Sequence, residues 1–225
     1  MVMAYDLIVH KVWVWYNQIK SKFEQEDSII MDCIKERRSI RKYKAQLVDK
    51  KIIDEIIKAG ILAPSAKNRQ PWKFIVYSEK SKNEMLIEME KGLLRERDSN
   101  ALLPNSKNEL ADAFNTLKIM REAPILIAIL NTNCSSPFIN IDTDNRITEI
   151  CDSLSIGAAV ENMLLKATEL GIGSLWIANT CFAYNELVDY IGTTHQLVGA
   201  ISLGYANEFP AARPRKCLED VVEYR

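Results

Sequence analysis

The chain has 225 residues, of which 48% are hydrophobic and 26% are charged. This composition is typical of a globular protein that buries a substantial core, and it excludes a disordered chain. The formal net charge of -1 disfavours a general nucleic-acid-binding protein, which would be basic overall or over one broad face.

The first 30 residues carry an apolar stripe at helical spacing. Its members are Ile8, Val12, Trp15, Ile19 and Phe23. The run is too short and too interrupted to span a bilayer, and it lacks the basic start and cleavage site of a signal peptide. We interpret residues 1–30 as an appended amphipathic helix, packed on the domain, on a second subunit or on a membrane surface. We expect a compact domain over residues 31–225.

The next segment predicts two helices, a loop and a strand. Residues 31–41 predict a helix that carries Ile34 inward and places Arg37 and Arg41 on one face. Asp49 predicts the N-cap of a second helix with an isoleucine face, which Pro64 ends. Residues 63–72 then predict a rigid polar loop, and residues 73–78 a strand.

The rest of the chain predicts a mixture of helices and strands. Residues 79–122 predict two polar helices around a loop, a composition suited to a lid. The apolar run 124–130 predicts a central strand. Residues 143–170 predict a long helix that is apolar nearly all round, as in a core or at a subunit interface. Further elements are expected as strands at 174–177 and 197–205 and a helix near 184–190.

The cysteines and histidines offer few routes to catalysis. The five cysteines are scattered and contain no CxxC pair, which predicts reduced thiols in a reducing compartment and hence a cytoplasmic protein. They are Cys33, Cys134, Cys151, Cys181 and Cys217. No His, Asp and Glu cluster has the spacing of metal ligands, so we expect no metal site. No GxSxG motif accompanies His10 or His195, and His195 is expected in a loop.

Two basic clusters lie far apart in the sequence. The first contains Arg37, Arg38 and Arg41, and the second is the segment 213–216 with Arg213, Arg215 and Lys216. The planar fork of arginine suits phosphate, and Ser39 adds a hydroxyl donor. Each cluster alone is typical of a solvated surface, but folding that joined them would form one phosphate site. Neither a Walker A motif nor GxGxxG occurs, so side chains would have to hold a nucleotide.

Several segments, taken in order, resemble the FMN-dependent nitroreductase family. They are residues 37–41, 63–72, 171–177 and 203–205, followed by the basic segment 213–216. The pairing of RRSxR with PSAxNxQPW is the most specific part. The resemblance covers residues 31–225.

The resemblance implies a fold, a cofactor and an assembly. The fold would be α+β, with a mixed, mostly antiparallel central sheet flanked by helices, in an intertwined homodimer with FMN at the interface. Hydride would pass from NADH or NADPH through the flavin to a nitro, quinone or similar conjugated acceptor in a ping-pong scheme. The chemistry would take place on the flavin, with no catalytic side chain.

The resemblance also assigns residues to the cofactor. The FMN phosphate and ribityl chain would be bound by Arg37, Arg38, Ser39 and Arg41, joined by Arg213 and Arg215. The partner subunit would contribute Pro64, Ser65, Ala66 and Asn68. Ile177, Ala178 and Asn179 would lie against the isoalloxazine, with a backbone N–H near its N5.

Some features of the family pattern do not carry over. Certain relatives have an acidic residue and a glycine where this chain has Ala178 and Asn179, so the preferred nicotinamide and acceptor stay open. A basic contact to flavin N1 and O2 would come from residues 79–122, where Lys107 is a guess. Two alternatives also stay open: a non-redox phosphate- or nucleotide-binding module, and another reaction of the same scaffold such as dehydrogenation, dehalogenation or flavin fragmentation.

Overall fold

The computed structural model describes residues 15–16, 32–98 and 100–225. The expected N-terminal helix therefore lies outside the described residues, except for Trp15 and Tyr16, which are helical and exposed. Within the described ranges, no helix is long and apolar enough to cross a membrane.

Four strands form the central sheet in the order β1-β2-β4-β3. Their bounds are β1 Trp72–Ser78, β2 Ile125–Asn131, β3 Gly173–Ile177 and β4 Gln196–Gly204. All three strand pairs are antiparallel. The expected mixed, mostly antiparallel sheet is confirmed in this form, since an isolated parallel bridge joins Ser39 to Ser174 on β3.

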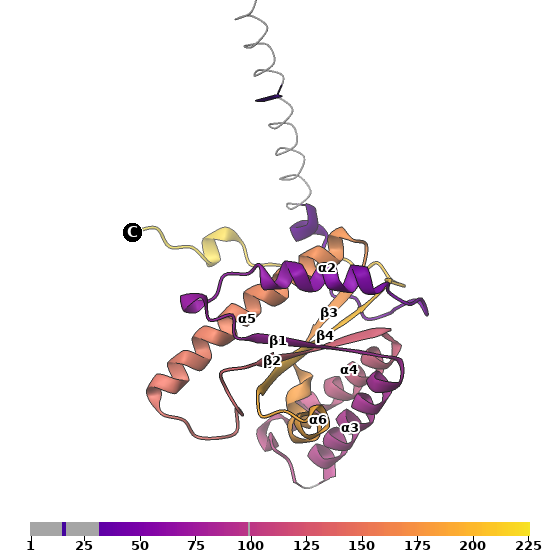
Figure 1. Cartoon of the computed structure of the whole chain (residues 1–225), viewed down its shortest axis with the longest axis vertical. Helices are drawn as coiled ribbons and strands as arrows, with labels where there is room; N and C mark the ends of the chain where they lie inside the picture. The colour runs from indigo at the N-terminus through magenta and orange to yellow at the C-terminus, as the bar shows by residue number, and fades with distance from the viewer. Residues whose placement is uncertain (1–14, 17–31, 99) are drawn as a thin grey trace, which may run out of the picture.

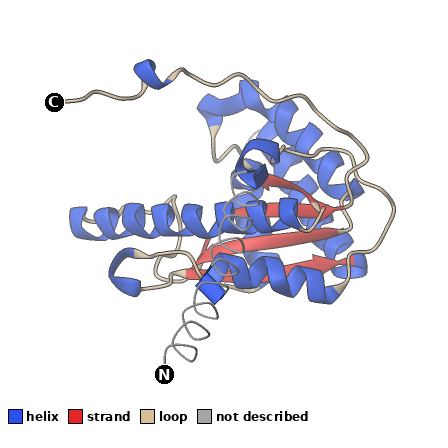
Figure 2. Ribbon diagram, turned by 90° about the horizontal axis from the view of Figure 1, so that it is seen from above, coloured by secondary structure: helices blue, strands red, loops and turns tan. Residues whose placement is uncertain are grey.

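Helices cover both faces of this sheet (Figure 1). On one face lie α2, Lys50–Ile61, and α5, Thr143–Glu169; on the other lie α3, Glu79–Asp98, α4, Leu110–Glu122, and α6, Tyr184–Ile191. Figure 2 shows helices lying over the strands when the molecule is seen from above. The central strand β2 is buried along its whole length because alternate side chains enter the two hydrophobic layers. Burial on both faces of the sheet explains why residues 124–130 form a continuous apolar run in the sequence.

The long helix α5 presents two different apolar faces. Its N-terminus is capped by Asp142, whose side chain accepts the N–H of Asn145 at 2.9 Å. Ile156 and Met163 are fully buried against the sheet, whereas Ile150 and Leu154 are 49% and 71% exposed. The helix is thus covered on one side within a single chain and uncovered on the other.

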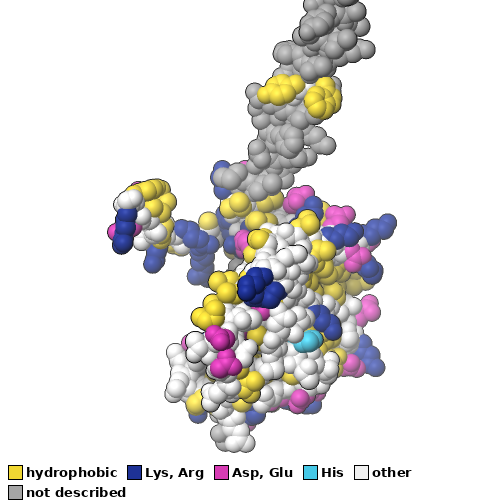
Figure 3. Space-filling view, turned by 60° about the vertical axis from the view of Figure 1, so that its left-hand side comes forward, with side chains coloured by type: hydrophobic (Ala, Val, Ile, Leu, Met, Phe, Trp, Pro, Cys, Tyr) yellow, Lys and Arg dark blue, Asp and Glu magenta, His cyan; other side chains and the backbone are white. Residues whose placement is uncertain are grey.

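The C-terminal segment leaves the body of the molecule after β4. Figure 3 shows its hydrophobic and charged side chains standing apart from the body. Leu218, Val221 and Tyr224 are 61%, 62% and 87% exposed. The end of the chain therefore carries apolar surface that its own domain does not cover.

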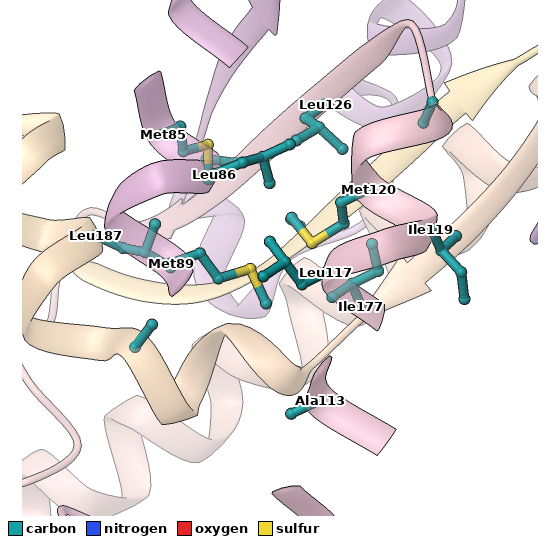
Figure 4. Packing of buried hydrophobic residues seen from close by; sticks show 14 of the residues in the cluster. Met85, Leu86, Met89, Ala113, Leu117, Ile119, Met120, Leu126, Ile177 and Leu187 are labelled. Atoms are coloured by element: carbon teal, nitrogen blue, oxygen red, sulfur yellow. The ribbon is translucent and has the colours of Figure 1, made fainter. Parts of the chain in front are cut away.

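The two helices expected within residues 79–122 are present as α3 and α4, but they form a packed layer, so the expectation of a lid is wrong. Met85 and Met89 of α3 and Leu117 and Met120 of α4 are at most 1% exposed. Their side chains lie against one another beneath the sheet (Figure 4). Helical residues four apart share a face, so Met85, Met89 and Leu93 form one stripe among many charged neighbours.

The helix expected over residues 31–41 is much shorter. Only residues 32–36 are helical, and Ile34 is 53% exposed. Beyond them the chain is extended: the N–H of Ile40 donates to the carbonyl of Ser174 at 2.9 Å, and that of Lys44 to Tyr205 at 2.9 Å. The expectation that two arginines share a helical face is wrong, because pairing with β3 replaces the helix.

Candidate functional site

The two basic clusters of the sequence line one cavity of about 310 Å³, which we call the basic cavity. The extended segment after residue 36 supplies one wall, and the segment after β4 supplies the other. Six of its described lining residues are cationic, and none is acidic. The lining consists of Ile34, Lys35, Arg37, Arg38, Ser39, Arg41, Pro210, Ala211, Ala212, Arg213 and Arg215. The fold therefore joins the clusters, as the sequence analysis required for a phosphate site.

The arginines of the basic cavity keep most of their charge available. Among the described residues, Arg37 pairs with one acidic side chain, with its Nε 3.3 Å from Glu161 Oε1 on α5. Arg38, Arg41 and Arg215 donate instead to backbone carbonyl oxygens at 2.5–3.2 Å. A carbonyl carries no net charge, so these bonds orient the guanidinium groups without neutralising them. The cavity is thus suited to a multiply charged anion.

Two side chains, the acidic Glu208 and the buried Tyr43, hold the backbone of the segment that carries these arginines. Glu208 accepts the N–H of Arg41 at 2.5 Å. The hydroxyl of Tyr43 donates to the carbonyl of Ile40 at 2.8 Å and lies 2.7 Å from Ser202 Oγ. Burial raises the pKa of the Tyr43 phenol, which therefore stays protonated.

A second cavity, of about 180 Å³, lies beside the end of β3, and we call it the Asn179 cavity. Its described lining consists of Arg41, Asp112, Asn115, Thr116, Ile119, Leu175, Trp176, Ile177, Ala178 and Asn179. Arg41 also lines the basic cavity, so the two sites meet at this side chain. The expected contacts Ile177, Ala178 and Asn179 are therefore brought close to the arginines.

Sequence reasoning missed the helix that forms the other wall of the Asn179 cavity. Asp112, Asn115 and Thr116 all come from α4, within residues 79–122, where the sequence offered only Lys107 as a guess for a site residue. Lys107, the guess for this region, is exposed on the 3-10 turn η2, Pro104–Glu109, and does not line the cavity. The three polar residues recur at spacings of three and four, but such spacing is common on any solvated helix.

The side chain of Asn179 connects the loop after β3 to α4. Its Nδ2 donates to Asp112 Oδ2 at 3.0 Å and to Thr116 Oγ1 at 2.9 Å. An ionised carboxylate only accepts hydrogen bonds, so the amide nitrogen must be the atom that faces Asp112. Nearby, burial raises the pKa of the Cys181 thiol, which disfavours a thiolate nucleophile at this loop.

The turn that follows, η3 (Asn179–Ala183), is fixed against α3. A Cβ added at Gly92 would lie 2.4 Å from the Cα of Ala183, so only glycine permits this approach. Arg95 donates to the carbonyl of Phe182 at 3.2 Å and to Glu186 at 2.6 Å. Burial alone would raise the pKa of Glu186, but the hydrogen bond from Arg95, the backbone hydrogen bond of Glu186 and the charge of Arg95 together outweigh it and lower the pKa.

The loop of residues 64–70, which we call the Arg69 loop, lies outside both cavities. Among the described residues that line them, none is Pro64, Ser65, Ala66 or Asn68. A single chain therefore does not bring these four residues to the arginines.

The Arg69 loop is nevertheless firmly built. Arg69 donates through Nε and Nη2 to Asp152 Oδ1 on α5 at 2.8 and 2.7 Å, and Asp152 is fully buried. Asn133 donates to the other oxygen of the carboxylate at 2.9 Å. The loop also contains three non-glycine residues with positive φ, namely Lys67 at 55°, Asn68 at 52° and Gln70 at 48°. Such conformations persist only where the surroundings hold them, as the ion pair with α5 does here.

The remaining sequence candidates lie away from these cavities. His195 is in the turn before β4, as expected. Within the described part of the chain, no group of three or more His, Cys, Asp or Glu residues is placed to hold a metal ion.

The sequence model of the Nitroreductase family matches residues 34–205, which is more than half of the chain. The chain belongs to the nitroreductase family. A protein of Archaeoglobus fulgidus, provisionally named NADH dehydrogenase/NAD(P)H nitroreductase, is 30% identical over 186 residues, which cover 79% of this chain and 87% of that protein.

Solved structures of nitroreductases share the fold. One from Desulfovibrio desulfuricans, provisionally named and solved in complex with FMN, has a TM-score of 0.63 and 24% identity, covering 87% of this chain and 96% of that one. The FMN-dependent nitroreductase NfnB of Mycobacterium smegmatis, solved in complex with NADPH, has a TM-score of 0.67 and 17% identity, covering 89% of this chain and 99% of that one. These likenesses confirm the α+β nitroreductase-like fold.

Proposed function

We propose that this member of the nitroreductase family is an FMN-dependent oxidoreductase. It takes hydride from NADH or NADPH and reduces a nitro, quinone or similar conjugated acceptor. One observation carries the proposal: the two basic clusters form one cationic cavity, and Arg41 connects that cavity to the loop Ile177–Asn179. A ligand with a phosphate at one end and an aromatic ring at the other suits this pair of cavities.

The residues present fit FMN. A phosphate monoester carries a charge of about −1.5 to −2 at neutral pH, and six cationic side chains face it here. Arg37, Arg38, Ser39 and Arg41 would hold the phosphate and ribityl chain, together with Arg213 and Arg215. Ile177, Ala178 and Asn179 would lie against the ring and orient it. When bound, FMN supplies the hydride chemistry, and the chain supplies position and electrostatics.

We propose that the site is completed by a second copy of the chain. The Arg69 loop lies outside both cavities, yet it is rigid and attached to α5. The outer face of α5 exposes Ile147, Ile150 and Leu154, and large uncovered apolar faces mark interaction surfaces. A homodimer across α5 would cover this face and bring Pro64, Ser65, Ala66 and Asn68 to the flavin of the partner.

We also propose that residues 31–225 are the FMN-binding domain and that residues 1–30 are appended to it. The match of the family model begins at residue 34, close to this boundary.

The proposed reaction is balanced without a protein nucleophile. NAD(P)H gives two electrons and one proton as hydride, and solvent gives a second proton. A quinone then leaves as hydroquinone, or a nitro compound as its nitroso product and water. Donor and acceptor occupy the same place in turn, which gives a ping-pong scheme.

The test is the flavin spectrum of the purified protein. We expect a yellow protein whose flavin absorbance is bleached when NADH or NADPH is added without oxygen. Colourless protein that cannot be reconstituted with FMN would overturn the proposal. Protein that binds FMN but is not bleached by either nicotinamide would support the non-redox alternative, a phosphate- or nucleotide-binding module. Bleaching without turnover of any nitro or quinone acceptor would favour another reaction of the same scaffold.

A further inference from the structure

The Asn179 cavity contains one acidic side chain that the proposed function leaves without a role. Of the described residues that line it, Arg41 and Asp112 carry charge. Asp112 is near the start of α4, and its Oδ2 accepts the Asn179 amide at 3.0 Å. The other contact of that amide, with Thr116 Oγ1 at 2.9 Å, lies one helical turn further along α4.

These two hydrogen bonds use both N–H groups of the Asn179 amide. The loop and α4 are therefore fixed relative to each other, and the carboxylate of Asp112 is kept on the wall of the cavity. The end of the turn η3 is held by α3, through the close contact of Gly92 with Ala183. The position of this negative charge is thus determined by contacts with two helices, α3 and α4.

The charge of Arg41 does not offset that of Asp112 once a phosphate is bound. Arg41 also lines the basic cavity, where a phosphate monoester neutralises cationic side chains. The hydrogen bond of Arg41 also supports this, since its Nη1 donates to the carbonyl of Ser39 in the phosphate-binding segment. With FMN bound, the phosphate neutralises Arg41, and Asp112 is the charged residue of the described lining of the Asn179 cavity that has no opposite charge.

We propose that Asp112, held in place by Asn179, is a specificity-determining residue that selects the electron acceptor by charge. Neutral or cationic nitro and quinone acceptors are favoured, and acceptors that carry a carboxylate or sulfonate near the ring are disfavoured. The inference rests on the proposed function, because it concerns the acceptor of the same flavin site. Asp112 is exposed in a single chain, so solvent partly screens its charge. Its interaction with a charged acceptor should therefore change the affinity for that acceptor by about threefold to tenfold.

The primary experiment measures binding to the oxidised holoenzyme, without turnover. Benzoate, benzyl alcohol and benzyltrimethylammonium have similar rings and different charges, and none of them is reduced. Their dissociation constants are obtained by titration of the flavin absorbance. The ratio of the benzoate constant to the benzyltrimethylammonium constant is compared between wild type and Asp112→Asn. We expect this ratio to fall by about tenfold in the variant.

Three further variants separate the effect of charge from that of structure. Asp112→Glu keeps the carboxylate and should retain the discrimination. Asp54→Asn removes an exposed carboxylate on α2, whose partner is Lys50 at 2.7 Å, and should leave the ratio unchanged. Asn179→Ala releases Asp112 from its hydrogen bond and should give an intermediate ratio.

The corresponding kinetic experiment uses the oxidative half-reaction. Enzyme reduced beforehand with dithionite is mixed with 4-nitrobenzoate, 4-nitrobenzyl alcohol or 4-nitrobenzyltrimethylammonium, so nicotinamide binding does not enter. Each acceptor has its own intrinsic reactivity, which cancels when wild type is compared with Asp112→Asn. We expect the preference of wild type for the cation over the anion to be reduced by about tenfold in the variant.

Ionic strength gives a measurement on wild type alone. Raising the salt concentration from ~0.01 M to ~1 M shortens the Debye length from about 30 Å to about 3 Å. The ratio of the benzoate constant to the benzyltrimethylammonium constant should therefore fall in wild type. Yellow protein with the same ratio in wild type and Asp112→Asn, or with a ratio insensitive to salt, would overturn this inference alone. Protein that takes up no FMN would overturn the proposed function, and this inference with it.

Discussion

The basic cavity and the Arg69 loop, which we assign to the two ends of one cofactor, are held in opposite ways. The arginines of the cavity are bonded to neutral carbonyl oxygens or, for Arg37, to the half-exposed Glu161. Arg69 instead donates twice to one oxygen of the fully buried Asp152, whose other oxygen accepts from Asn133. One region keeps its cations available for an external anion, whereas the other has its cation satisfied internally. The hydrogen-bond partner of an arginine in a recognisable motif thus indicates whether the arginine binds a ligand or holds a loop.

The largest effect should come from breaking the internal pair. Asp152→Ala would leave the guanidinium of Arg69 without its partner beside a buried site, which typically costs about 3–5 kcal/mol. We expect the free energy of unfolding in urea to fall by about that amount. Asp54→Ala, which removes an exposed pair with Lys50, is the control and should change it by less than about 0.5 kcal/mol. Equal effects of the two substitutions would contradict the distinction between the regions.

The second effect concerns the cavity itself. Arg37→Ala and Arg213→Ala each remove a charge-assisted contact worth about 1.5–3 kcal/mol, so FMN affinity should fall at least about tenfold. Because neither arginine has a buried acidic partner in the described part of the chain, the free energy of unfolding of the flavin-free protein should change little. Arg121→Ala, on the exposed pair with Glu90, is a matched control. If both cavity variants bind FMN as tightly as wild type, the phosphate site is elsewhere.

The smallest effect should come from Glu161, a carboxylate that competes with a ligand for the basic cavity. Glu161 Oε1 lies 3.3 Å from Arg37 Nε, and a phosphate would have to share that group. Exposed pairs contribute about 0–1 kcal/mol, so Glu161→Gln should tighten FMN binding by no more than about fivefold. Isothermal titration of flavin-free protein with FMN measures the change. Weaker binding in this variant would show that Glu161 orients Arg37 for the ligand and does not compete with it.

Apolar patterns predicted much of the fold. The run 124–130 gave the central strand, and Asp49 lies at the start of its helix as predicted. The extended course of residues 37–44 was missed because it depends on pairing with β3 and with the residues after β4, which lie more than 130 positions away. The core of α3 was missed because its methionines are surrounded by charged residues.

The site was predictable in part for a related reason. The arginines and the loop 177–179 belong to recognisable motifs, so their proximity could be anticipated. Asp112 and Asn115 belong to no motif and look like ordinary polar positions of a helix. Their role depends on the packing of α4 beside β3, which no local pattern encodes. Likewise, the sequence showed α5 as apolar all round, and only the packed structure separates its covered face from its uncovered one.

The bridge between Ser39 and Ser174 has a consequence for the behaviour of the protein during folding and storage. β1 and β3 are the two edges of the sheet, and an unprotected edge strand is a template for strands of other molecules. On β3 that template is covered by the same segment that carries the arginines, through the bond from Ile40 to Ser174. Whatever detaches this segment also opens the edge, so damage here should appear as aggregation of the protein as well as loss of colour.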